Sequence, residues 1–482
     1  MADAQQFDLV ILGAGTGGYY AAFRAKQLGL NVAVVERDKV GGVCLHRGCV
    51  PTKAFLKSAH FFEDVKKAAD MGVEFKGDAT MNFEAVLNRS LSIVSKNYNG
   101  LQYLFEKKNK VPVFKGNGVI KSKNEVEVTL NESGETVLLK CNNLIINTGS
   151  RPRPIKGIEF DGKVVFNSDH AVERADVPKR LIVRGLGATG VEWGQIYHSA
   201  GSEVTFVGNV VPQEDEDVQR EMTKQFKRQG INIIEGARPT AENFEISDKG
   251  VKMTVKDKKG KEHVVEADAL FVATGREPNV ENIGLETIGV KLNEKSDTDS
   301  GGYRGPAGYI AVDNLLRTNV EGVYAIGDVN GQQMLAHTAG HHGITAVEHI
   351  AGKNPFPINH LHIPSFTYTT PEIGSVGMTE KQAKDAGYNI KVGRFPLMPN
   401  AKATIEGKTE GFTKIIVDAD TDDVLGVHMV GVAATERIAE AGLGMTLNVS
   451  GEELAMTVHP HPTVSEVMGQ AAMDIYGQAI DI

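Results

Sequence analysis

The clearest hydrophobic pattern in the chain is a short, unbroken apolar run followed at once by glycines. Residues 8–12 read DLVIL and lead into the segment GAGTGG over 13–18. An uninterrupted run of this length is typical of a parallel strand that is buried on both faces. A helical pattern over 19–28 and a second apolar run over 31–36 follow. The order of strand, glycine turn, helix and strand predicts a dinucleotide-binding unit.

Each glycine of this turn has an expected role. Gly13 permits the tight turn, Gly15 lets a pyrophosphate approach the backbone, and Gly18 lets the helix pack on the strand. Glu36 ends the second strand, where an acid is expected to bind ribose hydroxyls.

The same pattern returns later in the chain. A strand over 181–183 leads into Gly185, Gly187 and Gly190, and a helix through 193–197 and a strand over 203–207 follow. The two units close with matching phrases, LIINTGSRP over 144–152 and LFVATGREP over 270–278. The repeat predicts two dinucleotide domains of common design.

The pattern changes after residues 351–353. Segments 414–418 and 424–430 read as antiparallel strands and 433–447 as a helix, without a glycine fingerprint. A last domain without a nucleotide of its own is a candidate dimerisation surface. The expected fold is α/β, with two Rossmann-like dinucleotide-binding domains and a C-terminal α+β dimerisation domain. Expected boundaries are 1–150 and 151–275 for the two dinucleotide domains, 276–350 for a central segment and 351–482 for the interface domain. The polar stretch over 293–309 is expected to be a surface loop.

Two of the three cysteines, Cys44 and Cys49, are separated by only four residues. A disulfide that closes so short a loop stabilises a long chain little. Pro51 and the run over 53–57 predict a helix start, so Cys49 lies at a helix N-terminus, which favours a thiolate. Two buried thiols or half of a zinc site are the alternatives. The pair is best interpreted as redox-active, whereas Cys141 is expected to be a small buried residue.

Composition and charge narrow the function further. The 482 residues suggest about three domains, and the net charge of −9 argues against nucleic acid as a partner. No apolar run approaches the ~20 residues of a membrane helix, and MADAQQF lacks the features of a signal peptide, so a cytoplasmic enzyme is expected. Two dinucleotide sites around one dithiol predict FAD in the first site and a nicotinamide nucleotide in the second.

The segment GGVCLHRGCVPTKAF over 41–55 resembles the redox helix of the pyridine nucleotide-disulfide oxidoreductases, and the resemblance runs the length of the chain. It implies a redox-active disulfide between Cys44 and Cys49, and Lys53 near the flavin and paired with Glu192. It also implies FAD in the domain over 1–150, a nicotinamide nucleotide in the domain over 151–275, and a segment over 276–350 that completes the FAD site. The implied FAD residues are Gly13, Gly15, Gly18, Glu36, Lys53, Gly116, Thr148, Gly149, Asp328, Leu335, Ala336 and His337, and the implied NAD residues are Gly185, Gly187, Gly190, Glu192, Gly208 and Gly275. Asp328 has a helix cap as its alternative role.

Residues 459–466 read HPHPTVSE. From the residues alone, this segment is either a surface turn or a histidine base oriented by a carboxylate. It is similar to the signature of the dihydrolipoamide dehydrogenase branch of the family. That similarity implies His461 as the base, Glu466 as its partner, and a homodimer that shares its active site between subunits. The implied reaction oxidises dihydrolipoamide on the lipoyl domain or E2 core of a 2-oxo acid dehydrogenase complex, or in the glycine cleavage system, with NAD⁺ as acceptor.

The chain departs from the family at the second nucleotide site. Gly208 and Asn209 follow the strand where NAD-dependent members have an acid, no arginine cluster follows directly, and Arg184 replaces an apolar residue. NAD is still expected, with a weakened or altered nicotinamide preference. Glutathione or mercuric reductase is the nearest alternative enzyme, and a binding subunit with a vestigial flavin is the alternative from another class.

Overall fold

The computed structural model describes residues 5–294 and 306–481, and the chain forms two compact units. Unit 1 comprises Met1–Pro51, Asn88–Arg153 and Arg276–His360. Unit 2 comprises Thr52–Leu87, Pro154–Gly275 and Leu361–Ile482. Most of the loop expected over 293–309 lies outside the described residues.

Unit 1 is built on a parallel sheet whose strands pair in the order β3, β2, β1, β5 and β16. These strands are β1 (Gln5–Leu12), β2 (Val32–Glu36), β3 (Val113–Ser122), β5 (Thr136–Ile146) and β16 (Val323–Ala325). The C-terminal half of β3 and the N-terminal half of β5 also pair antiparallel with β4 (Glu125–Leu130). A separate ribbon pairs β6 (Ser150–Pro152) with β15 (Arg276–Pro278).

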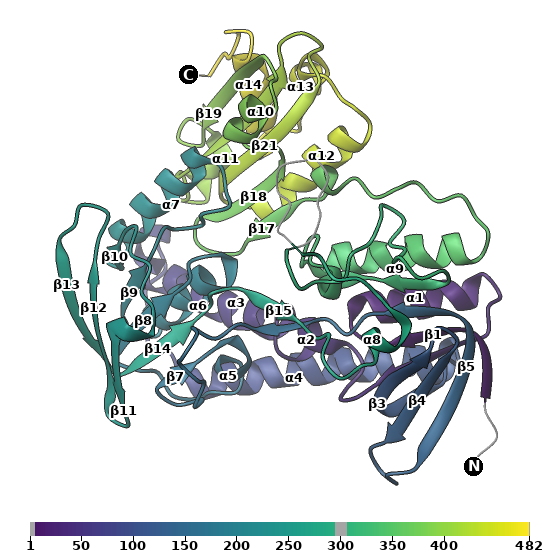
Figure 1. Cartoon of the computed structure of the whole chain (residues 1–482). Coiled ribbons are helices and arrows are strands. Elements are labelled where there is room, and N and C mark those ends of the chain that lie inside the picture. The colour runs from purple at the N-terminus through teal and green to yellow at the C-terminus, as the bar shows by residue number, and fades with distance from the viewer. Residues whose placement is uncertain (1–4, 295–305, 482) are drawn as a thin grey trace. The chain divides into compact units, whose positions relative to one another are not determined.

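Helices cover the sheet of unit 1 because its strands are apolar on both faces. Leu9 and Ile11 pack among residues of α1, whereas Val10 and Leu12 pack into a second cluster on the other face. The helix α1 (Thr16–Gln27) lies beside α9 (Ala336–Ile350) (Figure 1). The other helical elements are α2 (Gly42–His46), α8 (Leu285–Ile288), a π-helical turn (Leu104–Lys108) and a 3₁₀ turn (Gly327–Asn330). A boundary between the units falls within each of α3 (Cys49–Lys66) and α4 (Phe83–Tyr103).

Unit 2 contains a second parallel sheet, in the order β10, β9, β8, β14 and β7. Its strands are β7 (Val165–Phe166), β8 (Arg180–Arg184), β9 (Glu203–Val207), β10 (Asn232–Ile234) and β14 (Ala269–Val272). The helical elements here are α5 (Ser168–Ala171), α6 (Ala188–Ser199), α7 (Glu216–Arg228), and 3₁₀ turns at Ala68–Met71 and Ala241–Asn243. An antiparallel sheet of β11 (Phe244–Ser247), β12 (Gly250–Lys256) and β13 (Glu262–Ala267) accompanies them.

The C-terminal part of unit 2 is an antiparallel sheet in the order β17, β18, β21, β20 and β19. Its strands are β17 (Ser365–Thr367), β18 (Glu372–Gly377), β19 (Ile390–Pro396), β20 (Phe412–Asp418) and β21 (Val424–Gly431). Two helices lie against it, α12 (Ala434–Thr446) on β18 and β21, and α14 (Glu466–Asp474) on β19 and β20. The shorter helices are α10 (Glu380–Asp385), α11 (Ala401–Ile405) and α13 (Gly451–Met456), and His360–His362 form a 3₁₀ turn. Gly393 permits the close approach of α14, since a Cβ there would lie 2.0 Å from the Ala471 carbonyl oxygen.

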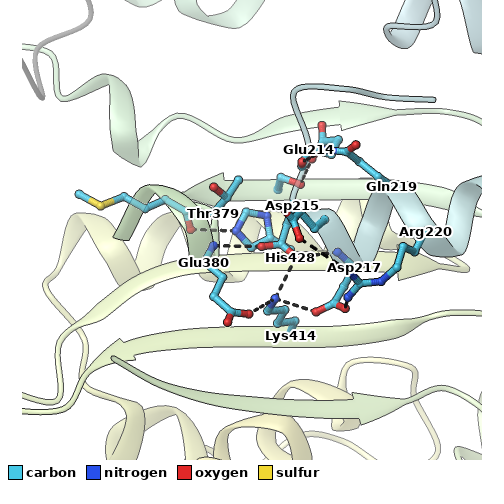
Figure 2. A network of polar contacts seen from close by, with 12 residues as sticks. Glu214, Asp215, Asp217, Gln219, Arg220, Thr379, Glu380, Lys414 and His428 are labelled. Carbon is cyan, nitrogen blue, oxygen red and sulfur yellow. Dashed lines mark hydrogen bonds and ion pairs between the residues drawn. The ribbon is translucent and has the colours of Figure 1, made fainter. Parts of the chain in front are cut away.

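A buried ion cluster in unit 2 joins α7, α10 and β20 (Figure 2). Lys414 of β20 is only 2% exposed, and its Nζ contacts Asp215 at 2.9 Å, Asp217 at 2.7 Å and Glu380 at 2.6 Å. Asp215 is the N-cap residue of α7 and also accepts a hydrogen bond from the Glu380 amide at 3.0 Å. An ammonium group has three donors, so each of them has a carboxylate partner here.

The structure confirms the α/β class, with two Rossmann-like sheets and a C-terminal α+β domain. Among the helices of residues 5–294 and 306–481, none is both long and apolar enough to span a membrane.

Candidate active site

The first glycine turn lies between β1 and α1 in unit 1. Gly13 has φ of +109°, and a Cβ there would lie 2.2 Å from the Asn147 carbonyl oxygen. A Cβ on Gly18 would lie 2.0 Å from the Gly13 carbonyl oxygen, so helix and strand pack as closely as expected. Gly15 is the N-cap of α1 and no side chain caps the helix, which leaves its first N–H groups for an anion such as a pyrophosphate.

Glu36 is tied directly to this turn. Its Oε2 accepts a hydrogen bond from the Ala14 amide at 2.8 Å, and its Oε1 accepts one from the Asp38 amide at 2.8 Å. Burial raises the pKa of Glu36. Gly116 lies nearby, directly after Lys115, which pairs with Glu36 in the sheet. A cavity of about 430 Å³ adjoins Glu36 and has the volume for a nucleoside; Asp38, Val40, Tyr98, Phe105 and Lys115 also line it.

Asp328 lies in the 3₁₀ turn after β16, where it has one hydrogen-bond partner and one ion-pair partner. Ser150 Oγ donates to Asp328 Oδ2 at 2.6 Å, and Arg276 Nε lies 3.6 Å from the same oxygen. The α9 helix then begins at Ala336, with Leu335 as N-cap and His337 in its first turn. Thr148 and Gly149 directly precede β6, and Thr148 Oγ1 donates to the Asn279 carbonyl at 2.7 Å. Except for Lys53, the residues expected at FAD therefore belong to unit 1, and the glycine turn, ribose acid and second helix start fit a dinucleotide.

The cysteine segment is held against the first glycine turn. Gly42 begins α2, and a Cβ on it would lie 2.7 Å from the Gly15 Cα. The Gly41 amide donates to the Ala14 carbonyl at 2.8 Å. Cys44 lies in α2, and Cys49 is the first residue of α3, as predicted from Pro51. Both cysteines are thus beside the position at which a dinucleotide would enter.

The two thiols differ in environment. Cys44 is partly buried and Cys49 is exposed. A hydrogen bond with the Cys49 side chain, followed by burial, raises the pKa of Cys44, so Cys44 keeps its proton while it contacts Cys49. Burial raises the pKa of Tyr19 to about 12, and the negative charges of the neighbouring Tyr20 and Cys44 add to this effect. Cys141 is buried in the core, as expected.

Lys53 and Glu192 form the expected ion pair within unit 2. Lys53 Nζ lies 3.0 Å from Glu192 Oε1 and 2.8 Å from Oε2, and the Glu192 side chain is almost fully buried. The Tyr368 amide donates to Glu192 Oε1 at 2.9 Å, and Lys53 Nζ lies 5.2 Å from the centre of the Tyr368 ring. The pair therefore has a fixed geometry.

The second glycine turn repeats the first. A Cβ on Gly185 would lie 2.3 Å from the Ala273 carbonyl oxygen, and one on Gly190 would lie 1.8 Å from the Gly185 carbonyl oxygen. Gly187 is the N-cap of α6, and no atom lies within 4 Å of its Cβ position. Gly208 and Gly275 follow β9 and β14, at the same edge of the parallel sheet. This arrangement fits a second dinucleotide.

His461 and Glu466 are paired within unit 2. His461 Nδ1 lies 2.8 Å from Glu466 Oε1, and the Thr463 amide donates to Glu466 Oε2 at 2.8 Å. The His461 side chain is 71% exposed. Burial would raise the pKa of Glu466, but the Thr463 amide and His461 outweigh it and lower that pKa. The carboxylate thus orients an imidazole that is accessible to an external partner.

Several residues of these sites were missed by sequence reasoning. Asn147 had no expected role, but its Nδ2 donates to the Gly13 carbonyl at 3.0 Å and supports the glycine turn. Ser150 and Arg276, which contact Asp328, were also missed. The only sequence signal for Asn147 was that Ala273 stands at the matching position of the second closing phrase.

Comparison with known proteins agrees with this geometry. The Pyridine nucleotide-disulphide oxidoreductase family matches residues 7–343, and its dimerisation domain matches residues 363–472. The chain belongs to this family, whose members use FAD and NAD, and the dimerisation domain supports a homodimer.

The most similar proteins found include several of one kind. The chain is 40% identical to dihydrolipoyl dehydrogenase from Bacillus subtilis, over 99% of both chains. It is 39% identical to dihydrolipoyl dehydrogenase 1, mitochondrial, from Arabidopsis thaliana, over 98% of this chain and 91% of the relative. A crystal structure of LpdA from Mycobacterium tuberculosis superimposes with a TM-score of 0.85 at 26% identity, covering 97% of this chain and 99% of that one. These comparisons confirm the resemblance to the dihydrolipoamide dehydrogenase branch.

Proposed function

We propose that the chain oxidises protein-bound dihydrolipoamide to lipoamide through a Cys44–Cys49 disulfide, with FAD as relay and NAD⁺ as acceptor. The observation that carries this proposal is the position of the cysteine segment, with Gly42 against Gly15 of the first dinucleotide turn. Its support is the relation to dihydrolipoyl dehydrogenases over nearly the whole chain. The domain boundaries near residues 150, 275 and 350, the cytoplasmic location and the lipoyl domain of an E2 core as partner belong to the same proposal.

The residues of this chain divide the reaction between them. In the proposed homodimer, His461 of one subunit, oriented by Glu466, takes a proton from one substrate thiol, and the thiolate attacks the Cys44 sulfur of the disulfide in the other subunit. The S–S bond breaks, Cys49 leaves as a thiolate, and a mixed disulfide joins substrate to Cys44. The second substrate thiol then displaces Cys44, which takes up a proton, and cyclic lipoamide leaves. The electron pair is now held by the two cysteines.

The proposed cofactor sites follow from the same geometry. When bound, FAD supplies two-electron transfer between a thiolate and a nicotinamide. Gly13, Gly15, Gly18 and Glu36 would hold its adenosine and pyrophosphate, and Asp328 and the start of α9 its ribityl side. Lys53 would be fixed by Glu192 beside the reacting ring. Gly185, Gly187, Gly190, Gly208 and Gly275 would hold the nicotinamide nucleotide.

The test is anaerobic reduction of the purified, flavin-loaded enzyme by dihydrolipoamide, followed by its visible spectrum. The wild type should develop a long-wavelength charge-transfer band between a thiolate and the flavin, and it should reduce NAD⁺. Cys44→Ser and Cys49→Ser should lose turnover while they retain flavin. His461→Gln should lower kcat by about 10²–10⁴-fold, the usual contribution of a general base.

Cys141→Ser is the matched control, because Cys141 is buried within the core of unit 1. It should retain the band and the turnover of the wild type. Turnover of Cys44→Ser or Cys49→Ser within a few fold of the wild type would overturn the proposal.

A further inference from the structure

The second nucleotide site has an unusual charge at the end where a ribose would lie. In dinucleotide folds, an acid at the end of the second strand binds the ribose hydroxyls. Here β9 ends at Val207 and is followed by Gly208, whose φ is +126°. This backbone conformation is one that residues with side chains rarely adopt. The position therefore lacks a carboxylate and is not shaped to receive one.

Arg184 points toward this gap. It is the last residue of β8 and pairs with Val207 of β9. Its Nη1 lies 3.8 Å from the point that a Cβ on Gly208 would take. Its Nε is buried without a hydrogen-bond partner. Among the described residues, no carboxylate contributes to the charge environment of Arg184. A guanidinium that is partly buried and uncompensated is costly unless a ligand satisfies it.

A second arginine comes from a different part of the chain. Arg238 is exposed and follows β10, which adjoins β9 in the sheet. The carbonyl oxygen of Ala237, the residue directly before Arg238, lies 3.7 Å from the Cβ position of Gly208, so the segment that carries Arg238 borders the same gap as Arg184. Burial and then repulsion from Arg238 lower the pKa of Arg184, in agreement with this arrangement. The sequence has no arginine cluster directly after Gly208, but the fold brings Arg238 from 30 positions further along the chain.

The carboxylate that directly follows β10 is already paired with lysines. Glu235 contacts Lys227 Nζ at 2.6 Å and is also bonded to Lys258. These contacts with Lys227 and Lys258 lower the pKa of Glu235, so it stays ionised and bound to the lysines. The side chain of Asn209 accepts a hydrogen bond from the Gly236 amide at 3.0 Å, which holds the segment after β10 against the end of β9. The local charge is therefore positive.

We infer that Arg184 and Arg238 bind a phosphate on the ribose, so that the second site takes a 2′-phosphorylated dinucleotide, NADP, more tightly than NAD. A phosphate supplies the counter-charge and the acceptor oxygens that the two guanidinium groups lack, in a geometry suited to arginine. Gly208 leaves space for it and adds no like charge. A ribose hydroxyl would leave the two cations uncompensated. The inference rests on the proposed function in one respect, that the second fold binds a nicotinamide nucleotide.

The experiment measures binding directly with fragments that cannot be turned over. The oxidised, flavin-loaded enzyme is titrated calorimetrically with adenosine 2′,5′-bisphosphate and with 5′-AMP, which differ only in the 2′-phosphate. The bisphosphate should bind at least about tenfold more tightly, as expected for one or more charge-assisted hydrogen bonds. Its dissociation constant should rise more steeply with salt than that of 5′-AMP. NADP and NAD should show the same order.

Two variants test the residues separately. Arg184→Leu and Arg238→Ala should each bring the ratio of the two dissociation constants toward one, while the affinity for 5′-AMP changes less than about threefold. Arg238 is exposed, so its variant should fold even if Arg184→Leu does not. Arg228→Ala is the matched control, because Arg228 ends α7 just before β10 begins, at the opposite edge of the sheet. It should retain the wild-type ratio.

The outcomes separate this inference from the proposed function. A wild-type ratio near one, or a ratio unchanged in Arg238→Ala and in a folded Arg184→Leu, would overturn the inference. The same preparations are reduced with dihydrolipoamide in the absence of nucleotide. If the charge-transfer band forms and the bisphosphate is not preferred, only the inference fails. If the band does not form, the proposed function fails, whatever the ratio.

Discussion

Replacing Lys414 with methionine tests how much unit 2 depends on its buried ion cluster. Methionine has a similar length and fills the same space, but it removes the ammonium group that three carboxylates share. Asp215 is 1% exposed and would lose its charged partner while it remains buried. Removing one member of a buried ion pair destabilises a protein by about 3–5 kcal/mol, because the remaining charge is uncompensated.

The lower end of this range applies here. Asp217 and Glu380 are 17% and 33% exposed, so water replaces part of what they lose. Asp215 keeps hydrogen bonds from the Asp217 and Glu380 amides, both at 3.0 Å. We therefore expect a loss of about 3 kcal/mol. At about 2–4 °C per kcal/mol, the usual scale for a large domain, the midpoint of thermal unfolding should fall by roughly 6–12 °C.

The assay is thermal unfolding of the flavin-loaded protein, with Lys408→Met as control. Lys408 also contacts a carboxylate, Asp64 at 3.0 Å, but both side chains are well exposed, so its loss should move the midpoint by less than about 2 °C. If Lys414→Met unfolds within 2 °C of Lys408→Met, the buried cluster contributes nothing beyond a surface pair and the reasoning is wrong.

The pH dependence gives the same test a second readout. Burial would raise the pKa of Asp215, but hydrogen bonds from the Glu380 amide and Lys414 outweigh it and lower that pKa. The pKa of Asp217 is lowered in the same way, against burial, by Lys414. A lowered carboxyl pKa contributes stability above its unfolded value of about 4, and that stability is lost as the pH falls through the folded pKa. The difference between wild type and Lys414→Met should therefore be constant near neutrality and shrink below about pH 4.

Three further predictions concern other parts of unit 2. The hydrogen bond with Glu440 outweighs burial and raises the pKa of His459. The pair should therefore stabilise the protein by roughly 1 kcal/mol below pH 6.5, and by less as the pH rises through the folded pKa. The difference in unfolding midpoint between wild type and Glu440→Gln should be larger at pH 5.5 than at pH 9. Gly190→Ala should lower the unfolding midpoint because its Cβ would clash with the Gly185 carbonyl oxygen. Gly187→Ala should fold normally because its Cβ would have open space around it, but it should bind the nicotinamide nucleotide more weakly, as measured by calorimetry, because the Cβ would fill that space. Glu466→Ala should lower kcat for dihydrolipoamide by about tenfold or more, with flavin content unchanged, because His461 loses its orienting carboxylate; an unchanged kcat would exclude that role.

Elements with one strong local signal were predictable from the sequence. The helix expected over 19–28 is α1 (Thr16–Gln27), which starts earlier because Gly17 and Gly18 continue the helical backbone. The strand expected over 31–36 is β2 (Val32–Glu36), and all of its residues are buried. Cys49 begins α3 because Pro51 stands in the first turn, where a missing N–H has no intrahelical partner to lose. In each case, the interactions that determine the element are between residues only a few positions apart in the sequence.

Contacts between distant residues were not predictable in this way. The pairing of Lys53 with Glu192 spans 139 positions and was expected only from the family resemblance. Lys414 stands in the apolar run of β20. A strand pattern cannot show that its ammonium group donates a hydrogen bond to Asp215, which is 199 positions away in the sequence. Arg184 was recognised as unusual, but its neighbour Arg238 becomes apparent only when β8, β9 and β10 are placed side by side. Pattern reading finds the backbone of a site and misses the side chains that complete it.

The two glycine turns show why this division arises. At both, a Cβ on the first glycine would lie within 2.4 Å of the carbonyl oxygen of the residue that directly follows the neighbouring strand. This residue is Asn147 in the first turn and Ala273 in the second. This close backbone approach is required of any chain that turns from strand to helix over a pyrophosphate, so it leaves the same glycine spacing in both sequences. The side chains then differ. Asn147 hydrogen-bonds the first turn, whereas Ala273 has only a methyl group near Gly190. The charged residue at each turn also differs. Glu36 is hydrogen-bonded to the first turn, whereas Arg184 directly precedes the second. The backbone requirement that both turns share thus identifies two nucleotide sites. The side chains that they do not share distinguish the sites: the first has a carboxylate suited to a ribose hydroxyl, and the second has a guanidinium group suited to a phosphate.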